Sequence, residues 1–114
     1  MKGRISPPAY SGRQSAKVWD VWLAEVPFHD STGSKLRHVL VTGHKGMDVE
    51  VAEMTSHTVR YDTDVTLLDL GHAGLDKTTV VKTRNRLTLK AGKLQTRLGG
   101  ISPYDLVNLN PQLS

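Results

Sequence analysis

The sequence predicts a mainly β fold: a small curled barrel followed by one short C-terminal helix. Three observations support this prediction. Short apolar runs of strand length recur along the chain, turn-forming residues separate them, and a clear helix start signal occurs near the C-terminal end. These features favour a barrel over a parallel α/β sheet. At 114 residues, the chain is expected to be one domain with a single modest core.

The expected strands follow an N-terminal arm. Residues 1–16 contain two prolines, two glycines and two arginines with little apolar content, so we expect a flexible arm there and a folded domain over 17–114. The strands are expected at Val18–Val26, Val39–Val41, Val49–Met54, Val65–Leu70, Thr79–Thr83, Arg86–Lys90 and Leu94–Leu98. The main loops are expected at Pro27–Lys35, Gly43–Met47 and Gly71–Lys77.

Two features mark the ends of this arrangement. Trp19 and Trp22 alternate in the first expected strand, so one should face the core and the other should face outward or towards a partner. At the other end, Ser102 is an N-cap residue with Pro103 at the first helical position and Asp105 in the first turn. We expect this helix to end before Asn110-Pro111.

Composition excludes several classes of protein. The chain has no cysteine, which rules out disulfide frameworks, thiolate zinc sites and cysteine nucleophiles, and suits a reducing cytoplasm. No apolar run approaches the ~18 residues that a membrane span needs. The basic N-terminus also lacks the apolar segment of a secretory signal. We therefore expect a cytoplasmic protein with no membrane partner.

Charge is unevenly distributed along the chain. Residues 1–76 carry 8 Lys/Arg and 10 Asp/Glu, whereas residues 77–114 carry 7 Lys/Arg and only Asp105. The C-terminal part therefore has a net charge of +6, against −2 for the rest. A dense basic segment within a folded domain suits a phosphate-binding surface, because neutralised phosphates release condensed counterions. A solvated strand face and a surface for an acidic protein are the alternatives.

Other chemical motifs are not supported. The segment Gly71–Thr78 resembles a nucleotide-binding P-loop, but Asp76 occupies the place of its second glycine and no helical pattern follows. No Gly-x-Ser-x-Gly elbow is present, so serine hydrolase chemistry has no support. The histidines show no metal-ligand spacing on one element: His29, His38, His44, His57 and His72. We expect neither a metal nor a cofactor.

Arg37 and Thr55 are the remaining candidates for chemistry. Each lies at the edge of an expected strand, where a barrel can present side chains to a shared groove. The structural alternative is that Arg37 pairs with a carboxylate and that Thr55 fills a strand position through its β propensity. RNA carries its own nucleophile, the 2′-hydroxyl. A metal-free ribonuclease therefore needs a proton acceptor, cations for the charged phosphorane and a donor for the leaving oxygen.

Several short motifs occur in the order found in the MazF/PemK family of toxin endoribonucleases, which the chain resembles over residues 18–110. The motifs are Trp19-Asp20-Val21-Trp22, Val26-Pro27-Phe28, Gly33-Ser34-Lys35-Leu36, Arg37-His38, Val51–His57, Ala73–Lys77 and Leu98–Ser102. Two positions depart from the family pattern. Trp19 stands where a glycine is usual, and His38 stands where a proline usually follows the arginine.

The resemblance implies an SH3-like barrel of the CcdB/PemK type that forms a homodimer, with single-stranded RNA along a groove at the dimer interface. It implies that Arg37 holds the scissile phosphate and that Thr55 hydrogen-bonds it, leaving a 2′,3′-cyclic phosphate and a 5′-hydroxyl. Together with the basic segment it predicts these RNA-binding residues: Ser34, Lys35, Ser56, His57, Lys82, Arg84 and Arg86. His38 is a possible accessory acid–base group.

The expected function is therefore a sequence-selective, metal-independent endoribonuclease toxin with an acidic antitoxin as its cognate partner. Two alternatives remain open at this point. A non-catalytic barrel could inhibit growth by binding a protein such as gyrase, and a plain RNA-binding module could use the same basic surface. Of the two tryptophans, the outward-facing one is expected to lie near the subunit contact.

Overall fold

The computed structural model describes residues 16–28, 30 and 32–113. The expected N-terminal arm lies outside them except for Ala16, which is buried in the core. The strands are β1 (Asp20–Pro27), β2 (Ser34–Lys45), β3 (Asp48–Thr55), β4 (Asp64–Thr66), β5 (Val80–Lys90) and β6 (Leu94–Gly100). The helices are α2 (Leu70–Ala73) and α3 (Pro103–Leu113), and a 3₁₀ turn spans Ala91–Lys93.

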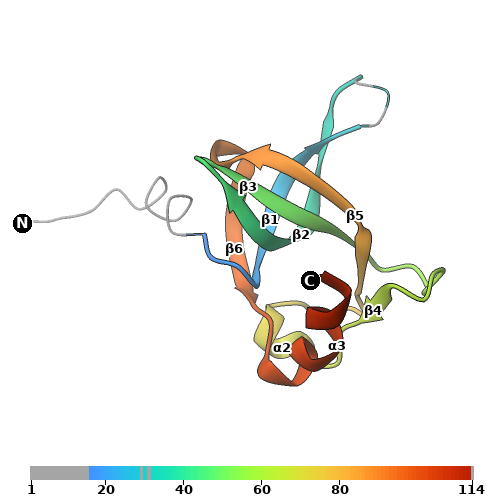
Figure 1. Cartoon of the computed structure of the whole chain (residues 1–114). Helices are drawn as coiled ribbons and strands as arrows, with labels where there is room; N and C mark the ends of the chain where they lie inside the picture. Colours follow the sequence, from blue (N-terminus) through green and yellow to red (C-terminus); the bar gives the residue numbers. More distant parts are fainter. Residues whose placement is uncertain (1–15, 29, 31, 114) are drawn as a thin grey trace, which may run out of the picture.

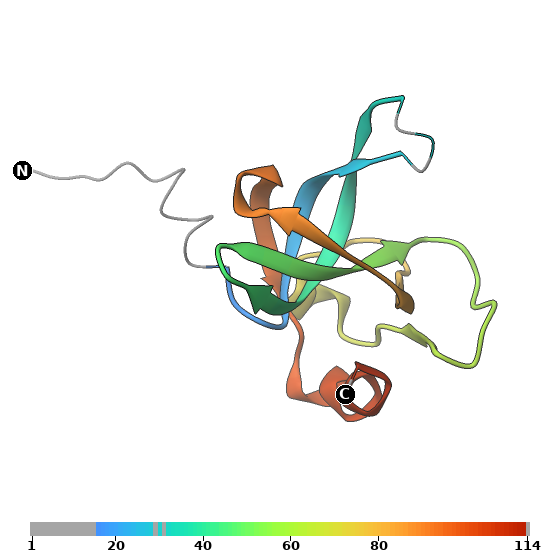
Figure 2. The same cartoon turned by 45° about the horizontal axis from the view of Figure 1, so that its top comes forward.

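The six strands form one antiparallel sheet in the order β4-β5-β3-β2-β1-β6. Figure 1 shows that this sheet is strongly curved and that α2 and α3 lie together below it. Figure 2 shows the same curl from another direction, with the β3–β4 loop projecting to one side. The expected mainly β barrel with a short C-terminal helix is confirmed. None of the helices in the described part of the chain is long and apolar enough to cross a membrane.

The central strands are buried on both faces, which explains the uninterrupted apolar run at Val39–Val41. Val39 and Val41 belong to the core cluster that also contains Trp22, whereas Leu40 belongs to the cluster that contains Leu109 of α3. Successive side chains of a strand point to opposite faces, so one strand contributes to both clusters. The first cluster is formed by strand residues and Ala16, whereas the second also includes Ala73 of α2 and Leu109 of α3 and so packs the sheet against the helices.

The start of β1 differs from the prediction because Trp19 is not in the strand. Trp19 has a φ of 78°, a left-handed conformation that normally favours glycine. Its N–H donates to the Val41 carbonyl and its carbonyl accepts from the Ile101 N–H, so this turn is tied to two neighbouring segments. The two tryptophans therefore do not alternate on one strand. Trp22 is the core residue at 2% exposure, and Trp19 is partly buried beside α3.

Other expected boundaries shift for local reasons. The strand predicted at Val65–Leu70 ends at Thr66, because Leu70 begins α2 and the Asp69 side chain accepts from the His72 N–H at the helix start. The loop predicted at Gly71–Lys77 therefore begins with a helical turn. The two strands predicted at Thr79–Thr83 and Arg86–Lys90 are one strand, β5, with an irregularity opposite Ala52/Glu53.

The bounds of one loop and of the C-terminal helix also differ from those expected. The loop predicted at Gly43–Met47 reduces to a turn at Gly46-Met47, because β2 continues to Lys45 and β3 begins at Asp48. Ser102 caps α3 as predicted, with its Oγ accepting from the Asp105 N–H. The predicted end of that helix before Asn110-Pro111 is wrong, since α3 includes Pro111. Leu113, beyond that proline, packs against the second core cluster and extends the helix contact.

Candidate functional site

A groove opens where strands β2 and β3 separate. Their ladder ends at the pair Val39 and Glu53. Beyond this pair, β2 continues alongside β1 as far as Ser34, while β3 continues alongside β5 as far as Thr55. The two strands thus follow different neighbours, and the backbone between them is no longer closed by hydrogen bonds. Two residues past the last pair on each strand lie Arg37 and Thr55, and both line the opening.

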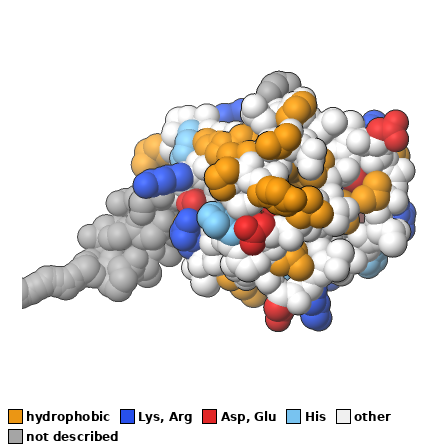
Figure 3. Space-filling view, turned by 90° about the horizontal axis from the view of Figure 1, so that it is seen from below, with side chains coloured by type: hydrophobic (Ala, Val, Ile, Leu, Met, Phe, Trp, Pro, Cys, Tyr) orange, Lys and Arg blue, Asp and Glu red, His pale blue; other side chains and the backbone are white. Residues whose placement is uncertain are grey.

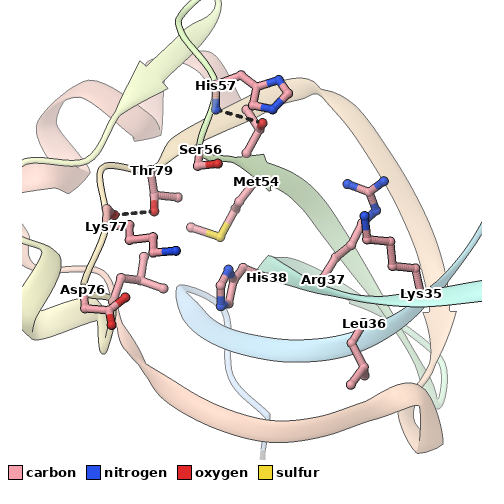
Figure 4. Close-up of a pocket in the computed structure, with 12 residues that line it drawn as sticks. Lys35, Leu36, Arg37, His38, Met54, Ser56, His57, Asp76, Lys77 and Thr79 are labelled. Carbon is pink, nitrogen blue, oxygen red and sulfur yellow. Dashed lines mark hydrogen bonds between the residues drawn. The ribbon is translucent and has the colours of Figure 1, made fainter.

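The groove has a volume of about 420 Å³. Its walls come from the β2 start, the β3 end and the loop that follows α2: Lys35, Leu36, Arg37, His38, Met54, Thr55, Ser56, His57, Leu75, Asp76, Lys77 and Thr79. Figure 4 shows Arg37 and Lys35 side by side on one wall, with His57 and Ser56 on another and Lys77 reaching in from the third. The His38 ring lies close to the Met54 side chain at the centre of the view.

Arg37 has the properties of a ligand-binding arginine. Its side chain is partly exposed on the groove wall, and within the described ranges it forms no ion pair. By contrast, Arg97 pairs with Asp20 at 3.2 Å and Lys93 pairs with Glu25 at 3.1 Å. The structural alternative, in which Arg37 pairs with a carboxylate, is therefore not what the structure shows. A guanidinium without a partner can bind an oxyanion through two parallel N–H donors.

The Thr55 hydroxyl is held in a defined position. Its Oγ1 accepts a hydrogen bond from the His57 backbone N–H at 3.1 Å. A hydroxyl that accepts in this way still has its own O–H to donate, so Thr55 can offer a hydrogen bond to a bound oxyanion. The same short turn brings Ser56 and His57 to the rim of the groove, where both are exposed.

The charge of the groove favours an anionic ligand. Lys35, Arg37 and Lys77 contribute three cations, and Asp76 contributes one carboxylate. None of the three cations is ion-paired among the residues that the structure describes. In the same part of the chain, no group of three His, Asp or Glu side chains is arranged to hold a metal ion. The arrangement can therefore bind a phosphate through arginine, lysine and hydroxyl donors.

The structure brings most of the predicted site residues together. Arg37, Thr55, Lys35, Ser56 and His57 line the groove, as does the accessory candidate His38. Lys82 lines a smaller pocket that shares Thr55 and His57 with the groove.

The other three predicted residues lie elsewhere. Ser34 is exposed at the start of β2 and is absent from the groove lining. Arg84 stacks on Tyr61, with its guanidinium carbon 4.9 Å from the ring centroid. Arg86 lies 3.8 Å from Glu50 and donates to the carbonyl of Gln112 at 3.3 Å, so its side chain is engaged with a neighbouring strand and with α3.

Sequence reasoning identified Ala73–Lys77 as a motif but did not assign this loop to the groove, whose third wall it forms. Leu75, Asp76, Lys77 and Thr79 reach the groove because Gly74 packs directly on β6. A Cβ on Gly74 would lie 1.9 Å from the Leu98 carbonyl oxygen, and its φ is 75°. The signal was present in the Ala-Gly-Leu motif and in the basic residue Lys77, but its position beside Arg37 depends on tertiary packing.

Comparison with known proteins gives matches in structure but not in sequence. No protein-family model matches the chain, and no curated protein sequence matches it. An endoribonuclease from a mycobacterial species aligns with a TM-score of 0.68 and 17% identity, covering 87% of this chain and 88% of that one. The Mycobacterium tuberculosis toxin MazF-mt6 aligns with a TM-score of 0.67 and 21% identity, covering 82% and 91%.

A MazE–MazF structure from Deinococcus radiodurans gives a similar result. It aligns with a TM-score of 0.64 and 21% identity, covering 88% of this chain and 92% of that one. Another match is a mycobacterial endoribonuclease in complex with its cognate antitoxin, with a TM-score of 0.68 and 18% identity. These alignments cover nearly the whole described domain. The chain therefore has the fold of the MazF toxins.

Proposed function

We propose that the protein is a sequence-selective endoribonuclease toxin of a type II toxin–antitoxin system, acting on single-stranded RNA in the cytoplasm. The observation that carries the proposal is the pair of Arg37 and Thr55 across the open end of the β2–β3 ladder. The MazF-like fold supports it, because several structures with this fold are endoribonucleases or MazF toxins. An acidic antitoxin is the proposed protein partner.

The proposed chemistry uses the RNA's own 2′-hydroxyl. This oxygen forms a bond to the neighbouring phosphorus and loses its proton, while the bond from phosphorus to the 5′-oxygen breaks and that oxygen gains a proton. The products have a 2′,3′-cyclic phosphate and a 5′-hydroxyl. Because the nucleophile belongs to the substrate, no metal-activated water is required, and the reaction is proposed to be metal-independent.

The groove residues have distinct roles in this scheme. Arg37 binds two phosphate oxygens and stabilises the charge that develops on the phosphorane, and Thr55 donates its O–H to the same group. Lys35 and Lys77 add positive charge on opposite walls. Arginine keeps its proton, so the proton transfers are assigned to the groove imidazoles His38 and His57.

The face of the protein that carries α2 and α3 supports a homodimer. Hydrophobic side chains gather on the face that carries α2 and α3 (Figure 3), where Tyr104 and Val107 are 70% and 72% exposed. Next to them, a shallow apolar hollow is lined by Trp19, Pro103, Leu106, Val107 and Asn110. An exposed apolar surface of this kind is typical of a subunit contact. We propose that Trp19 lies at or near it.

A second candidate function uses the same apolar face. A barrel that binds a target protein through α3 would inhibit that protein without cutting RNA, and the exposed Tyr104 and Val107 favour such a contact. RNA cleavage separates the two candidates. Purified protein incubated with a long single-stranded RNA in excess EDTA should cut it at a restricted set of sequences, leaving 2′,3′-cyclic phosphate ends. Intact RNA under these conditions would reject the endoribonuclease proposal and favour the protein-binding one.

A further inference from the structure

A second pocket of about 140 Å³ adjoins the groove. It shares Thr55 and His57 with the groove, and its other walls are Thr58, Arg60, Asp64 and Lys82. These come from the β3–β4 loop, from β4 and from β5, on the side where that loop projects from the barrel (Figures 1 and 2). Because the groove and the second pocket share residues, an RNA strand bound at Arg37 and Thr55 can continue into the second pocket along one surface.

Asp64 fixes the loop that forms this pocket. Its Oδ2 accepts from the backbone N–H of Arg60 at 3.0 Å and from that of Tyr61 at 3.3 Å. Its own N–H donates to the Tyr61 carbonyl at 3.0 Å. The carboxylate is therefore held against the loop backbone through Oδ2, while its Oδ1 is buried and has no hydrogen-bond partner among the described residues. Arg60 and Lys82 form no ion pair within the described part of the chain, so the pocket carries two cations against the single carboxylate of Asp64.

An aromatic residue stands beside these cations. Tyr61 is 51% exposed, and Arg84 lies over its ring at 4.9 Å from the centroid. Arg84 follows Lys82 by two residues on β5, within the irregular part of the strand opposite Ala52/Glu53. A partly exposed ring interleaved with arginine and lysine is the arrangement that binds single-stranded RNA, with bases stacked on the ring and cations on the backbone.

We propose that this pocket and the Tyr61–Arg84 pair form a subsite for the RNA nucleotide that adjoins the scissile phosphate. Arg60 and Lys82 bind the phosphate of that nucleotide, and Tyr61 stacks on its base. Asp64 is a positioning residue that holds the loop in place. This inference rests on the proposed function. Lys82 and Arg84 were already predicted to bind RNA, and the inference adds roles for Arg60, Tyr61 and Asp64 and assigns the pocket to one nucleotide.

The test pairs protein variants with shortened substrates. An oligoribonucleotide with several nucleotides on each side of the cut is compared with two versions, one trimmed on the 5′ side and one on the 3′ side. For the wild type, one of the two trims should lower kcat/KM by about tenfold or more, the size of a lost base-stacking contact. Tyr61→Leu should cause a similar loss on the full substrate and little further loss on that trimmed one.

Matched variants isolate the cause. Tyr61→Phe keeps the ring, so the loss of kcat/KM on the trimmed substrate should be the same as for the wild type. Lys82→Gln should reduce RNA binding. Its matched control, Lys45→Gln, lies at the far end of β2 outside the pocket and should leave RNA binding unchanged. Equal losses for Tyr61→Leu on full and trimmed substrates would overturn the subsite.

A binding measurement separates the subsite from the chemistry. Affinity for a 2′-O-methyl analogue that cannot be cut should show the same trim dependence and the same response to Tyr61→Leu. A wild type that binds the analogue without cutting any RNA would reject the endoribonuclease while leaving the subsite standing. A wild type that cuts RNA with no trim dependence would reject the subsite alone. Preference of these residues for an acidic peptide over the RNA analogue would also overturn the inference.

Discussion

Replacing Arg37 by alanine should remove most of the RNA cleavage while leaving the fold intact. The structure gives the reason for both halves of this prediction. Arg37 lines the groove together with Thr55, and among the described residues it makes no ion pair that the folded state would lose. A solvated side chain of this kind changes the free energy of unfolding by about 0.5 kcal/mol or less.

The catalytic loss should be much larger. Removing one preorganised donor to a developing oxyanion costs on the order of 10²- to 10³-fold in rate, or about 3–4 kcal/mol. Arg37→Lys should restore little of it, because an ammonium lacks the planar two-pronged fit of a guanidinium. Lys45→Gln, on the far end of β2, is the matched control and should cut like the wild type.

The assay is initial cleavage rate on a fluorescent RNA, together with thermal unfolding of each variant. An Arg37→Ala protein that cuts RNA at the wild-type rate would refute the site assignment. A variant that has lost activity but also unfolds at a much lower temperature than the wild type would refute the claim that Arg37 does not stabilise the fold.

Three further predictions follow from the same geometry. Thr55→Val should lower cleavage by about tenfold or more, because it removes the O–H donor while keeping the strand-compatible shape, and Thr55→Ser should retain most activity. Gly99→Ala should destabilise the protein by about 2 kcal/mol and lower the melting temperature by roughly 8–15 °C. The reason is that the added Cβ would lie 2.6 Å from backbone atoms of Ala73 and His72. Gly71→Ala is the control: a Cβ there meets open space, so the melting temperature should change little. Sedimentation at micromolar concentration should show a species of two 12.6 kDa chains, and a charged substitution, Trp19→Glu, should shift it towards the monomer; a monomer that is fully active would contradict the proposed contact.

The fold class was predictable from local patterns, whereas the pairing of Arg37 and Thr55 was predicted from the resemblance to the MazF/PemK family. Alternating apolar residues identify strands, and the register of β2 and β3 follows from their apolar runs. In the structure, Arg37 and Thr55 each lie two residues beyond the last β2–β3 pair, Val39 and Glu53, and both line the groove.

Other features depend on contacts between distant segments. The positive φ of Trp19 is unexpected for a bulky residue, and it is held by hydrogen bonds to Val41 and Ile101. The family's usual glycine at this position is explained by that backbone conformation. The helix extends past Pro111, and Leu113 beyond it packs against the second core cluster, a contact that opposes the local stop signal. Neither outcome can be read from a window of neighbouring residues.

The most direct test of the central claim is to locate a bound RNA on the protein by NMR. Backbone amide shifts would be recorded while an uncleavable 2′-O-methyl oligonucleotide is added. RNA bound in the β2–β3 groove should move the amides of residues 35–38 and 55–57 first and most strongly. Shifts confined to the amides of α3, with residues 35–38 and 55–57 unmoved, would contradict the account.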